Sequence, residues 1–367
     1  SSTSYHRFAL ELFLFPYVFG KKLGHSFSNN YISKVQKMLE VVLYISDPNN
    51  CIPQIGDNDD GRLIILSHYR NWTKNDFSYL LGIGGFLFDR DDFKGNCKLQ
   101  PEELFWIYNY NQFENQVPIK DIRKRSKSFF DSGFFVIHNE PTQDYALIKL
   151  GVPKKHAPKG HTHNDILSLS LFSKGQSIFI DRGTYCYTFD TKMRNIYRSS
   201  FSHNIITINN LEINMIGEEI FNLDWDLNSV CKEWKITDDK IIFVGEHDGY
   251  KKRLNVIVRR TVIYNIPDSE WLIIDEVEGI LNNIELISTN WILNPNLHFQ
   301  IKNSSDDEVT TLHDKSNNIN LDFIGHSNIS LQNSDYSPSY GIIKSTKKIN
   351  TKINKNNGRY IAKLRIS

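Results

Sequence analysis

Net charge of either sign is almost absent from this chain. Its 367 residues include 43 Lys and Arg against 42 Asp and Glu, which leaves a formal net charge of +1 at pH 7. Such a chain has no global field to attract a polyanion, and no basic stripe interleaves with its aromatic residues. Nucleic-acid binding therefore has little support. Recognition of an acidic polymer would have to come from a local cluster such as Lys192, Arg194 and Arg198.

Cysteines and long apolar runs are also scarce. The four cysteines are Cys51, Cys97, Cys186 and Cys231. They are widely spaced and form no CxxC pair, so they neither make a zinc ribbon nor prove an oxidising compartment. No apolar stretch approaches the length needed to span a bilayer. Residues 8–19 are apolar but contain Glu11 and Pro16, and they lack a basic leader and a cleavage site. They predict a buried helix, not a signal peptide.

Helical patterns dominate the first third of the chain. The expected helices cover residues 8–19, 32–43, 77–88 and 101–110. Hydroxyl side chains at residues 2–4 precede the first helix, and a Thr73-x-x-Asp76 capping box precedes the third. Pro101 suits the first turn of the fourth. A length of 367 residues with 40% hydrophobic residues is enough for a second core as well.

After about residue 128 the apolar pattern changes from the helical period to a period of two. Short β-rich runs cover residues 134–138, 145–150, 166–172, 177–180, 204–208, 241–246, 254–264, 271–276 and 360–366. Polar clusters separate these runs, as antiparallel sheets require. Residues 303–318 and 344–358 are rich in Asn, Ser, Lys and Asp and predict long loops or weak strands. The pattern favours an α+β chain of two domains, residues 1–127 and 128–367.

The residues best suited to chemistry gather in one stretch, residues 159–209. His161 and His163 stand two positions apart in chain that reads as extended, so their side chains are expected on one side. Asp181 ends the next strand, and His203 begins another apolar run. Imidazole nitrogens and a carboxylate oxygen suit zinc, so three strands could form a metal site here. The alternative is that these polar residues only satisfy turns and neighbouring strands.

Five motifs in this order resemble the heparinase II/III-like family of polysaccharide lyases, over the chain from its first residues to about residue 265. They are Tyr5-His6-Arg7-Phe8, the Ile55–Arg62 loop with Asp57, Asp59 and Asp60, His161-x-His163-x-Asp165, Asp181-x-Gly-Thr-Tyr185, and Arg194…Tyr197-Arg198…His203-Asn204. The resemblance implies part of an (α/α) toroid over residues 1–127, followed by a large antiparallel β-sandwich over residues 128–367. It also implies further helix pairs upstream, because four helices cannot close a toroid. One of the upstream loops would carry an Asn or His that neutralises the substrate carboxylate.

The resemblance implies β-elimination on a uronic-acid polysaccharide. The proton on C5 is poorly acidic, so an enzyme must offset the C5 carboxylate charge, remove the proton and protonate the departing O4. Tyr5 matches the family's catalytic tyrosine, as proton donor and base. His161 matches the residue that holds the carboxylate or assists proton removal. Tyr187 is the candidate for a second acid/base tyrosine, narrowly ahead of Tyr197.

Other residues are expected to bind the substrate or a metal. The candidate substrate contacts are His6, Arg194, Tyr197 and Arg198. An arginine can fork onto a carboxylate or sulfate, although pairing with Asp181 or Asp190 is the alternative here. The expected metal ligands, by match to the family, are His163, Asp181 and His203, with zinc in a structural role. In the Asp57–Asp60 loop, a hydrogen-bonded turn is favoured over catalysis.

A polysaccharide lyase acting on an acidic glycan is thus the leading hypothesis. The alternative is a carbohydrate-binding or surface-polysaccharide assembly protein that keeps the fold without turnover. A hydrolase is less attractive, because it needs two carboxylates across one cleft and Asp57, Asp59 and Asp60 cluster in one loop. A periplasmic or extracellular location is expected rather than a cytoplasmic one.

Overall fold

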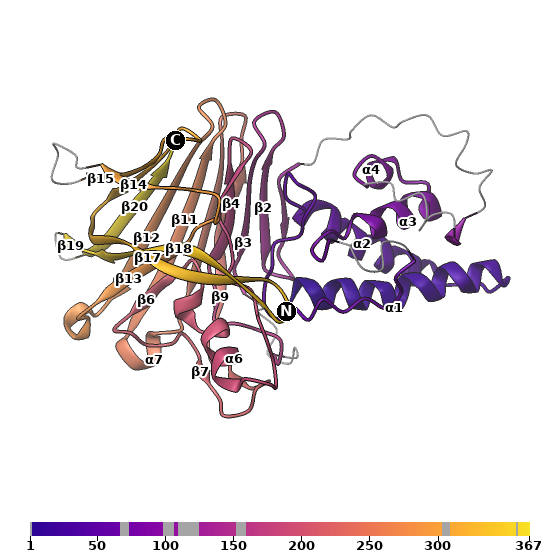
Figure 1. Cartoon of the computed structure of the whole chain (residues 1–367), viewed down its shortest axis with the longest axis horizontal. Helices are drawn as coiled ribbons and strands as arrows, with labels where there is room; N and C mark the ends of the chain where they lie inside the picture. Colours follow the sequence, from indigo (N-terminus) through magenta and orange to yellow (C-terminus); the bar gives the residue numbers. More distant parts are fainter. Residues whose placement is uncertain are drawn as a thin grey trace.

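A computed structural model of the protein describes residues 2–66, 73–97, 106–108, 125–151, 159–302, 309–356 and 359–367. Helices occupy the first part of the chain and strands the rest (Figure 1). The helices of the first part are α1 (Thr3–Lys22), α2 (Asn29–Ile45), α3 (Ser78–Phe88) and α4 (Asp91–Lys94). Most of the predicted fourth helix, residues 101–110, lies outside the described residues. No described helix is long and apolar enough to cross a membrane.

The first helix starts where its sequence provides a cap. The Ser2 hydroxyl accepts a hydrogen bond from the Tyr5 N–H, 3.2 Å away, which satisfies one of the free donors of the first turn. The predicted hydroxyl cap is confirmed. The capping box predicted for α3 is wrong, since this helix begins at Ser78, five residues after Thr73. The Asp76 carboxylate accepts the Ser78 N–H directly, at 2.9 Å.

The strands form antiparallel sheets, as the period of two predicted. One five-stranded sheet has the order β1 (Lys127–Phe129), β2 (Phe134–Asn139), β3 (Asp144–Lys149), β4 (Ser168–Ser173) and β5 (Gln176–Phe179). The largest sheet has the order β14 (Gln300–Lys302), β15 (Val309–Asp314), β16 (Ile319–Ile324), β20 (Arg359–Ile366), β12 (Glu270–Gly279), β11 (Val256–Asn265), β10 (Lys240–His247) and β9 (Ser229–Ile236), with β19 (Lys355–Asn356) on β20.

Two smaller sheets and several short helices complete the β part. The four-stranded sheet has the order β17 (His326–Ser339), β18 (Ile342–Ile353), β13 (Ile287–Ile292) and β6 (Ile206–Ile208), and the two-stranded sheet pairs β7 (Met215–Ile216) with β8 (Leu223–Asp224). The short helices are α6 (Thr191–Arg198), η2 (Ser200–Ser202), α7 (Lys251–Leu254) and η3 (Leu281–Asn283). The polar segment predicted as loops or weak strands, residues 344–358, lies mostly in the long strand β18.

The five-stranded sheet is a shared middle layer between the helices and the rest of the β part (Figure 1). In β2, Phe134 and Val136 pack with the helices, while Phe135 and Ile137 enter the sandwich core. Alternate side chains of a strand point to opposite faces, so one strand serves both cores. This explains why β2 and β3 are apolar in nearly continuous runs. The α+β architecture predicted from the sequence is confirmed.

The loop that joins α2 to α3 lies against the surface of the β part. Between α2 and α3, the Gln54 side chain donates to the Pro338 carbonyl at 2.9 Å. The Asn58 N–H donates to the Thr184 hydroxyl, also at 2.9 Å. The Tyr340 N–H donates to Asp60, 2.8 Å away, from the tip of the β17–β18 hairpin. These bonds fix residues 54–60 against the strands, next to the N-terminus of α1.

Candidate active site

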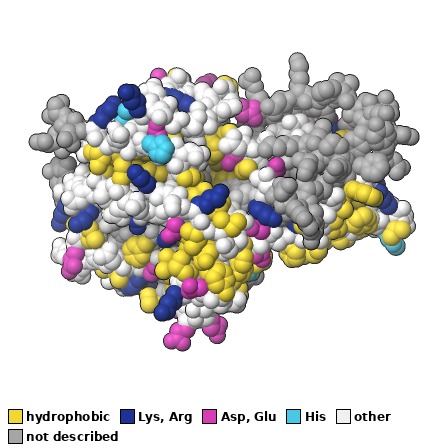
Figure 2. Space-filling view, in the orientation of Figure 1, with side chains coloured by type: hydrophobic (Ala, Val, Ile, Leu, Met, Phe, Trp, Pro, Cys, Tyr) yellow, Lys and Arg dark blue, Asp and Glu magenta, His cyan; other side chains and the backbone are white. Residues whose placement is uncertain are grey.

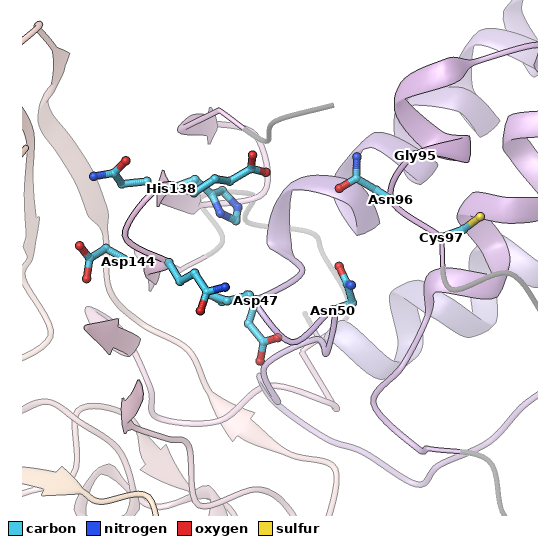
Figure 3. A pocket seen from close by; sticks show the side chains of 11 residues that line it. Asp47, Asn50, Gly95, Asn96, Cys97, His138 and Asp144 are labelled. Atoms are coloured by element: carbon cyan, nitrogen blue, oxygen red, sulfur yellow. The ribbon is translucent and has the colours of Figure 1, made fainter. Parts of the chain in front are cut away.

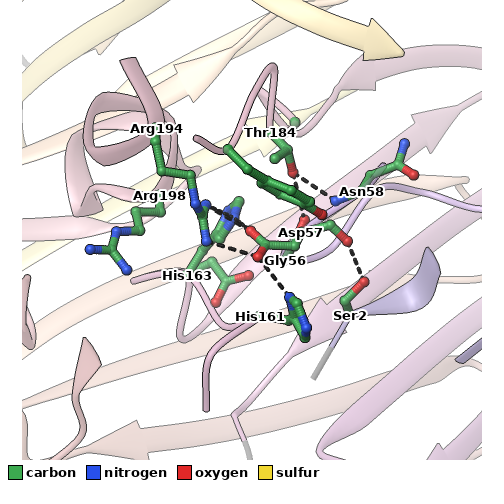
Figure 4. Close-up of polar contacts among 12 residues, drawn as sticks. Ser2, Gly56, Asp57, Asn58, His161, His163, Thr184, Arg194 and Arg198 are labelled. Carbon is green, nitrogen blue, oxygen red and sulfur yellow. Dashed lines mark hydrogen bonds and ion pairs between the residues drawn. The ribbon is translucent and has the colours of Figure 1, made fainter. Parts of the chain in front are cut away.

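Asp57 is the centre of a buried polar cluster at this junction (Figure 4). Its Oδ2 lies 2.9 Å from Nδ1 of His161, and its Oδ1 lies 2.8 Å from Nε2 of His163. The two histidines precede β4 in an irregular loop, not in a strand. Their backbone is held there as well, because the Asp57 N–H donates to the His161 carbonyl at 3.2 Å. The predicted convergence of the two side chains is thus organised by a carboxylate from the helical part.

Arg194, from α6, pairs with the same carboxylate. Its Nη1 lies 2.7 Å from Asp57 Oδ1, and its Nη2 donates to Oδ2 at 2.8 Å, with both side chains fully buried. Burial by itself would raise the pKa of the Asp57 carboxyl. The hydrogen bonds from His161 and His163 and the charge of Arg194 overcome that effect and hold the pKa well below its usual value. Asp57 is therefore a carboxylate at every physiological pH.

Tyr5 stacks on His161. Their ring centroids are 3.7 Å apart with an interplanar angle of 18°, and the Tyr5 hydroxyl donates to Asp59 Oδ2 at 3.0 Å. Burial, with a smaller contribution from the charges of Asp59 and Asp57, raises the pKa of the Tyr5 hydroxyl to about 12. Tyr5 comes from α1 and His161 from the β part, so the pair spans the two halves of the molecule. His161 remains partly open to solvent, with a side-chain exposure of 36%.

Tyr187 lies beside this pair. Burial raises the pKa of its hydroxyl strongly, and the nearby charge of Asp57 and the hydroxyl of Tyr5 raise it further. Its ring contacts Phe221 at 5.5 Å and Tyr340 at 5.2 Å between centroids, both edge to face. The Tyr187 N–H donates to the Tyr340 hydroxyl at 3.1 Å. Of the two candidates for a second acid/base tyrosine, Tyr187 and Tyr197, Tyr187 is the one placed next to Tyr5.

Three of the predicted substrate contacts face other parts of the protein. His6 Nε2 lies 3.0 Å from the Met38 carbonyl of α2, and burial lowers the pKa of this imidazole. The Tyr197 side chain is buried, and its hydroxyl donates to Asp335 of β17 at 2.6 Å. Arg198 is also buried and donates to the carbonyls of residues 217, 219, 220 and 222, at 2.8 to 3.4 Å. Direct contact of these residues with a glycan stays a prediction, and so does that of Arg194.

The predicted metal ligands divide into two hydrogen-bonded pairs. Asp181 Oδ2 lies 2.8 Å from His203 Nδ1, while His163 bonds Asp57, and the His163 and His203 ring centroids are 5.3 Å apart. Within the described part of the chain, His163 Nδ1 and His203 Nε2 are buried and have no hydrogen-bond partner. Zinc binds the free nitrogen of an imidazole whose other nitrogen is hydrogen-bonded to a carboxylate.

These two nitrogens are suited to zinc, while the third expected ligand, Asp181, bonds His203 Nδ1 in this structure. Among the described residues, no group of three or more His, Cys, Asp or Glu side chains is arranged to hold a metal ion. Zinc stays a prediction, which elemental analysis of the purified protein can check.

A separate cavity of about 210 Å³ lies between the helices and the β2–β3 hairpin (Figure 3). Its polar lining includes Asp47, Asn50, Asn96, His138 and Asp144. It contains none of the residues that the sequence motifs singled out. The Asp144 carboxylate is engaged by the hydroxyls of Tyr264 and Thr142 and by the Lys174 N–H.

Two residues of the site were not anticipated as functional. The sequence favoured a structural turn at Asp57, although the loop motif that contains it was the available signal. Phe221 carried no signal at all. Its ring lies edge to face with His161 at 5.4 Å and is 42% exposed beside the Tyr5–His161 pair. Apolar side chains are exposed around this end of the β part (Figure 2).

Comparison with known proteins identifies relatives of this chain. The family description "Heparinase II/III-like, C-terminal" matches residues 121–362. A heparin-sulfate lyase of Bacteroides stercoris is 25% identical over 370 residues, covering 95% of this chain and 46% of the relative. A heparin-sulfate lyase of Pedobacter heparinus is 22% identical over 362 residues, with the same coverage. The chain thus spans about half the length of these relatives.

Solved structures show the same fold. A heparinase III superposes with a TM-score of 0.70 at 20% identity, over 100% of this chain and 51% of the other. The heparan sulfate lyase HepC from Pedobacter heparinus superposes with a TM-score of 0.70 at 17% identity, over 100% and 52%. The family match, the fold and the order of the five motifs lead to one assignment: this chain belongs to the heparinase II/III-like family.

Proposed function

We propose that the protein is a polysaccharide lyase that cleaves a uronic-acid-containing glycan by β-elimination. The observation that supports this most directly is the stacked pair of Tyr5 and His161 at the junction of the two parts, with Tyr187 beside it. A phenol and an imidazole are the acid and base that this reaction needs. Relatives named as heparin-sulfate lyases point to a glycosaminoglycan as the substrate class.

The proposed reaction begins with removal of the C5 proton by His161. The electron pair of the C5–H bond forms the C4=C5 double bond, and the C4–O4 bond breaks. Tyr5 gives its proton to the departing O4, so the products are an unsaturated uronate and a new chain end. A pKa of about 12 keeps the Tyr5 hydroxyl protonated near neutral pH, as a proton donor requires.

The substrate carboxylate also needs a neutralising group. The terminal nitrogens of Arg194 are bonded to Asp57, and those of Arg198 to backbone carbonyls, so the terminal nitrogens of both side chains are occupied in this arrangement. We propose that the neutralising Asn or His comes from a helical segment outside this chain, as the length of the relatives suggests. The full-length protein is accordingly the right material for an activity test. A periplasmic or extracellular location remains a prediction.

Substitution of Tyr5 by Phe tests the assignment. Tyr5→Phe keeps the ring that stacks on His161 and removes only the hydroxyl, so we expect formation of unsaturated uronate, followed by ultraviolet absorbance, to fall by about 10²-fold or more. Tyr31→Phe makes the same change at a hydroxyl that bonds the Phe13 carbonyl between α1 and α2, and should leave the rate unchanged.

Two results would count against the proposal. Wild-type rates in Tyr5→Phe would remove Tyr5 from the mechanism. If the unsubstituted full-length protein binds a uronate polymer but never yields the unsaturated product, a carbohydrate-binding or polysaccharide-assembly role replaces the lyase.

A further inference from the structure

We propose that Asp57 is a positioning residue that fixes the proton of neutral His161 on Nδ1 and leaves the Nε2 lone pair available to the substrate. The catalytic role in this inference rests on the proposed lyase function, whereas the position of the proton on His161 does not. No sequence motif assigned this role to Asp57. It follows from the donors that surround one buried carboxylate (Figure 4).

The hydrogen-bond inventory of Asp57 determines the tautomer. A carboxylate offers about four acceptor positions and no donor. Two of them face the N–H groups of Arg194, at 2.7 and 2.8 Å, a fork that matches an ionised carboxylate. The other two face His161 Nδ1 at 2.9 Å and His163 Nε2 at 2.8 Å. Because Asp57 can only accept, Nδ1 of His161 must carry a proton. His163 Nε2 also lies 3.3 Å from Arg194 Nη1, so its state is not fixed by Asp57 alone.

The second nitrogen of His161 then has a defined state. A neutral imidazole with its proton on Nδ1 has an unprotonated Nε2, which accepts protons. Among the described residues Nε2 has no hydrogen-bond partner, and 36% of the side chain is exposed. Stacking on Tyr5 at 3.7 Å and the edge contact with Phe221 at 5.4 Å hold the plane of the ring. Asp57 thus sets the proton position, and the aromatic rings set the orientation.

A purely structural role for Asp57 is the competing explanation, because the carboxylate also balances the buried charge of Arg194. Nitrogen NMR of the full-length protein labelled with ¹⁵N-histidine separates the two. We expect His161, assigned by its loss in His161→Gln, to show a protonated Nδ1 and an unprotonated Nε2 in its neutral form. A protonated Nε2 would overturn the proposal. This measurement needs neither lyase activity nor an Asp57 variant that folds.

Kinetics supply the second test. Asp57→Asn replaces one acceptor oxygen by an N–H₂ donor, so the His161 proton is no longer confined to Nδ1. We expect kcat to fall between about 10²- and 10⁴-fold, with KM changed less than about threefold. The matched control is Asp268→Asn, the same change in the turn between β11 and β12, where Asp268 bonds the Asn265 side chain and no histidine.

The outcomes are distinguishable. If Asp57→Asn folds and its kcat stays within threefold of that of Asp268→Asn, Asp57 does not act through His161 and the inference is overturned. If the unsubstituted protein forms no unsaturated uronate, the proposed function fails, and the NMR result still decides where the proton lies.

Discussion

The exposed ring of Phe221 lies beside His161, the proposed base, with 5.4 Å between the ring centroids. Arg198 holds the backbone on either side of it, through the carbonyls of Ile220 and Asn222 at 3.0 and 2.8 Å. An apolar ring face held on a fixed loop suits the C–H face of a pyranose. Arg198 thus helps to shape the site through the backbone of the segment that carries Phe221.

Phe221→Ala should weaken substrate binding more than it slows the reaction. An aromatic contact contributes about 0.5–1.5 kcal/mol beyond the area it buries, so we expect KM to rise roughly 2- to 10-fold with little change in kcat. Phe189→Ala is the matched control, since Phe189 is exposed but contacts Tyr185, not His161. Steady-state kinetics on a uronate polymer decide the matter, and an equal KM in both variants would rule out the stacking role.

At the residue scale, the sequence could indicate Tyr5 and His161 but not how their neighbours point. Tyr5 and His6 are adjacent in a helix, where 3.6 residues make a turn, so their side chains diverge by about 100° and only one can face the junction. Asp57 lies 104 residues from His161, and its contacts depend on tertiary packing that no local pattern encodes. The partner of Arg194 was unpredictable for the same reason.

Gly183 marks the closest approach of the 181–187 loop to β17. Its φ is +84°, and a Cβ there would lie 2.4 Å from the Ser337 carbonyl oxygen. Gly341, at the tip of the β17–β18 hairpin, has a similar φ of +75°, but a Cβ would meet nothing within 4 Å. The two glycines share the left-handed conformation and differ in the space around them.

Alanine substitutions at Gly341 and Gly183 therefore separate the cost of backbone strain from the cost of crowding against the Ser337 carbonyl. Gly341→Ala should lower the free energy of unfolding by about 1–2 kcal/mol, the cost of a left-handed non-glycine residue. Gly183→Ala should lower it further, because the Ser337 backbone must move. Denaturant unfolding of both proteins measures the difference. Equal losses would show that the contact with β17 relaxes without penalty.

At the scale of elements, apolar runs with a period of two predicted the strands reliably where those strands are buried. Strands β2 and β3 are apolar on both faces because two cores share them. The polar strand β18 was less visible, since its sequence lacks an apolar alternation and its partners are β17 and β13. Such a strand is specified by cross-strand pairing more than by its own pattern.

For the whole molecule, acid should destabilise the fold through buried neutral histidines. Burial lowers the pKa of His247 and of His326 to about 4, against 6.5 in the unfolded chain. Between these values the unfolded chain binds protons that the folded protein does not. Stability is therefore full above about pH 6.5 and is lost as pH falls toward 4, with a slope of up to about 1.4 kcal/mol per pH unit for each histidine.

Unfolding free energies measured from pH 7 to pH 4 test this expectation. The double variant His247→Gln, His326→Gln should show a flatter decline than the wild type, whatever its absolute stability. An unchanged slope would mean that these two side chains are not the source of the acid sensitivity.

Residue 57 and the β17–β18 tip are far apart in the sequence. The ribosome therefore makes them at different times, which has a consequence for biosynthesis. Asp60 is held by the Tyr340 N–H, and Tyr187 lies against the Tyr340 ring. At roughly 5–20 residues per second, a ribosome needs about 15 to 60 s to travel from the first of these segments to the last. Once residue 161 has been made, the nascent chain has Tyr5, Asp57 and His161, but it still lacks the β17–β18 tip that holds the loop of residues 54–60. The proposed site is thus completed only after residue 340 has been made, and chains truncated before the hairpin should fail to assemble it.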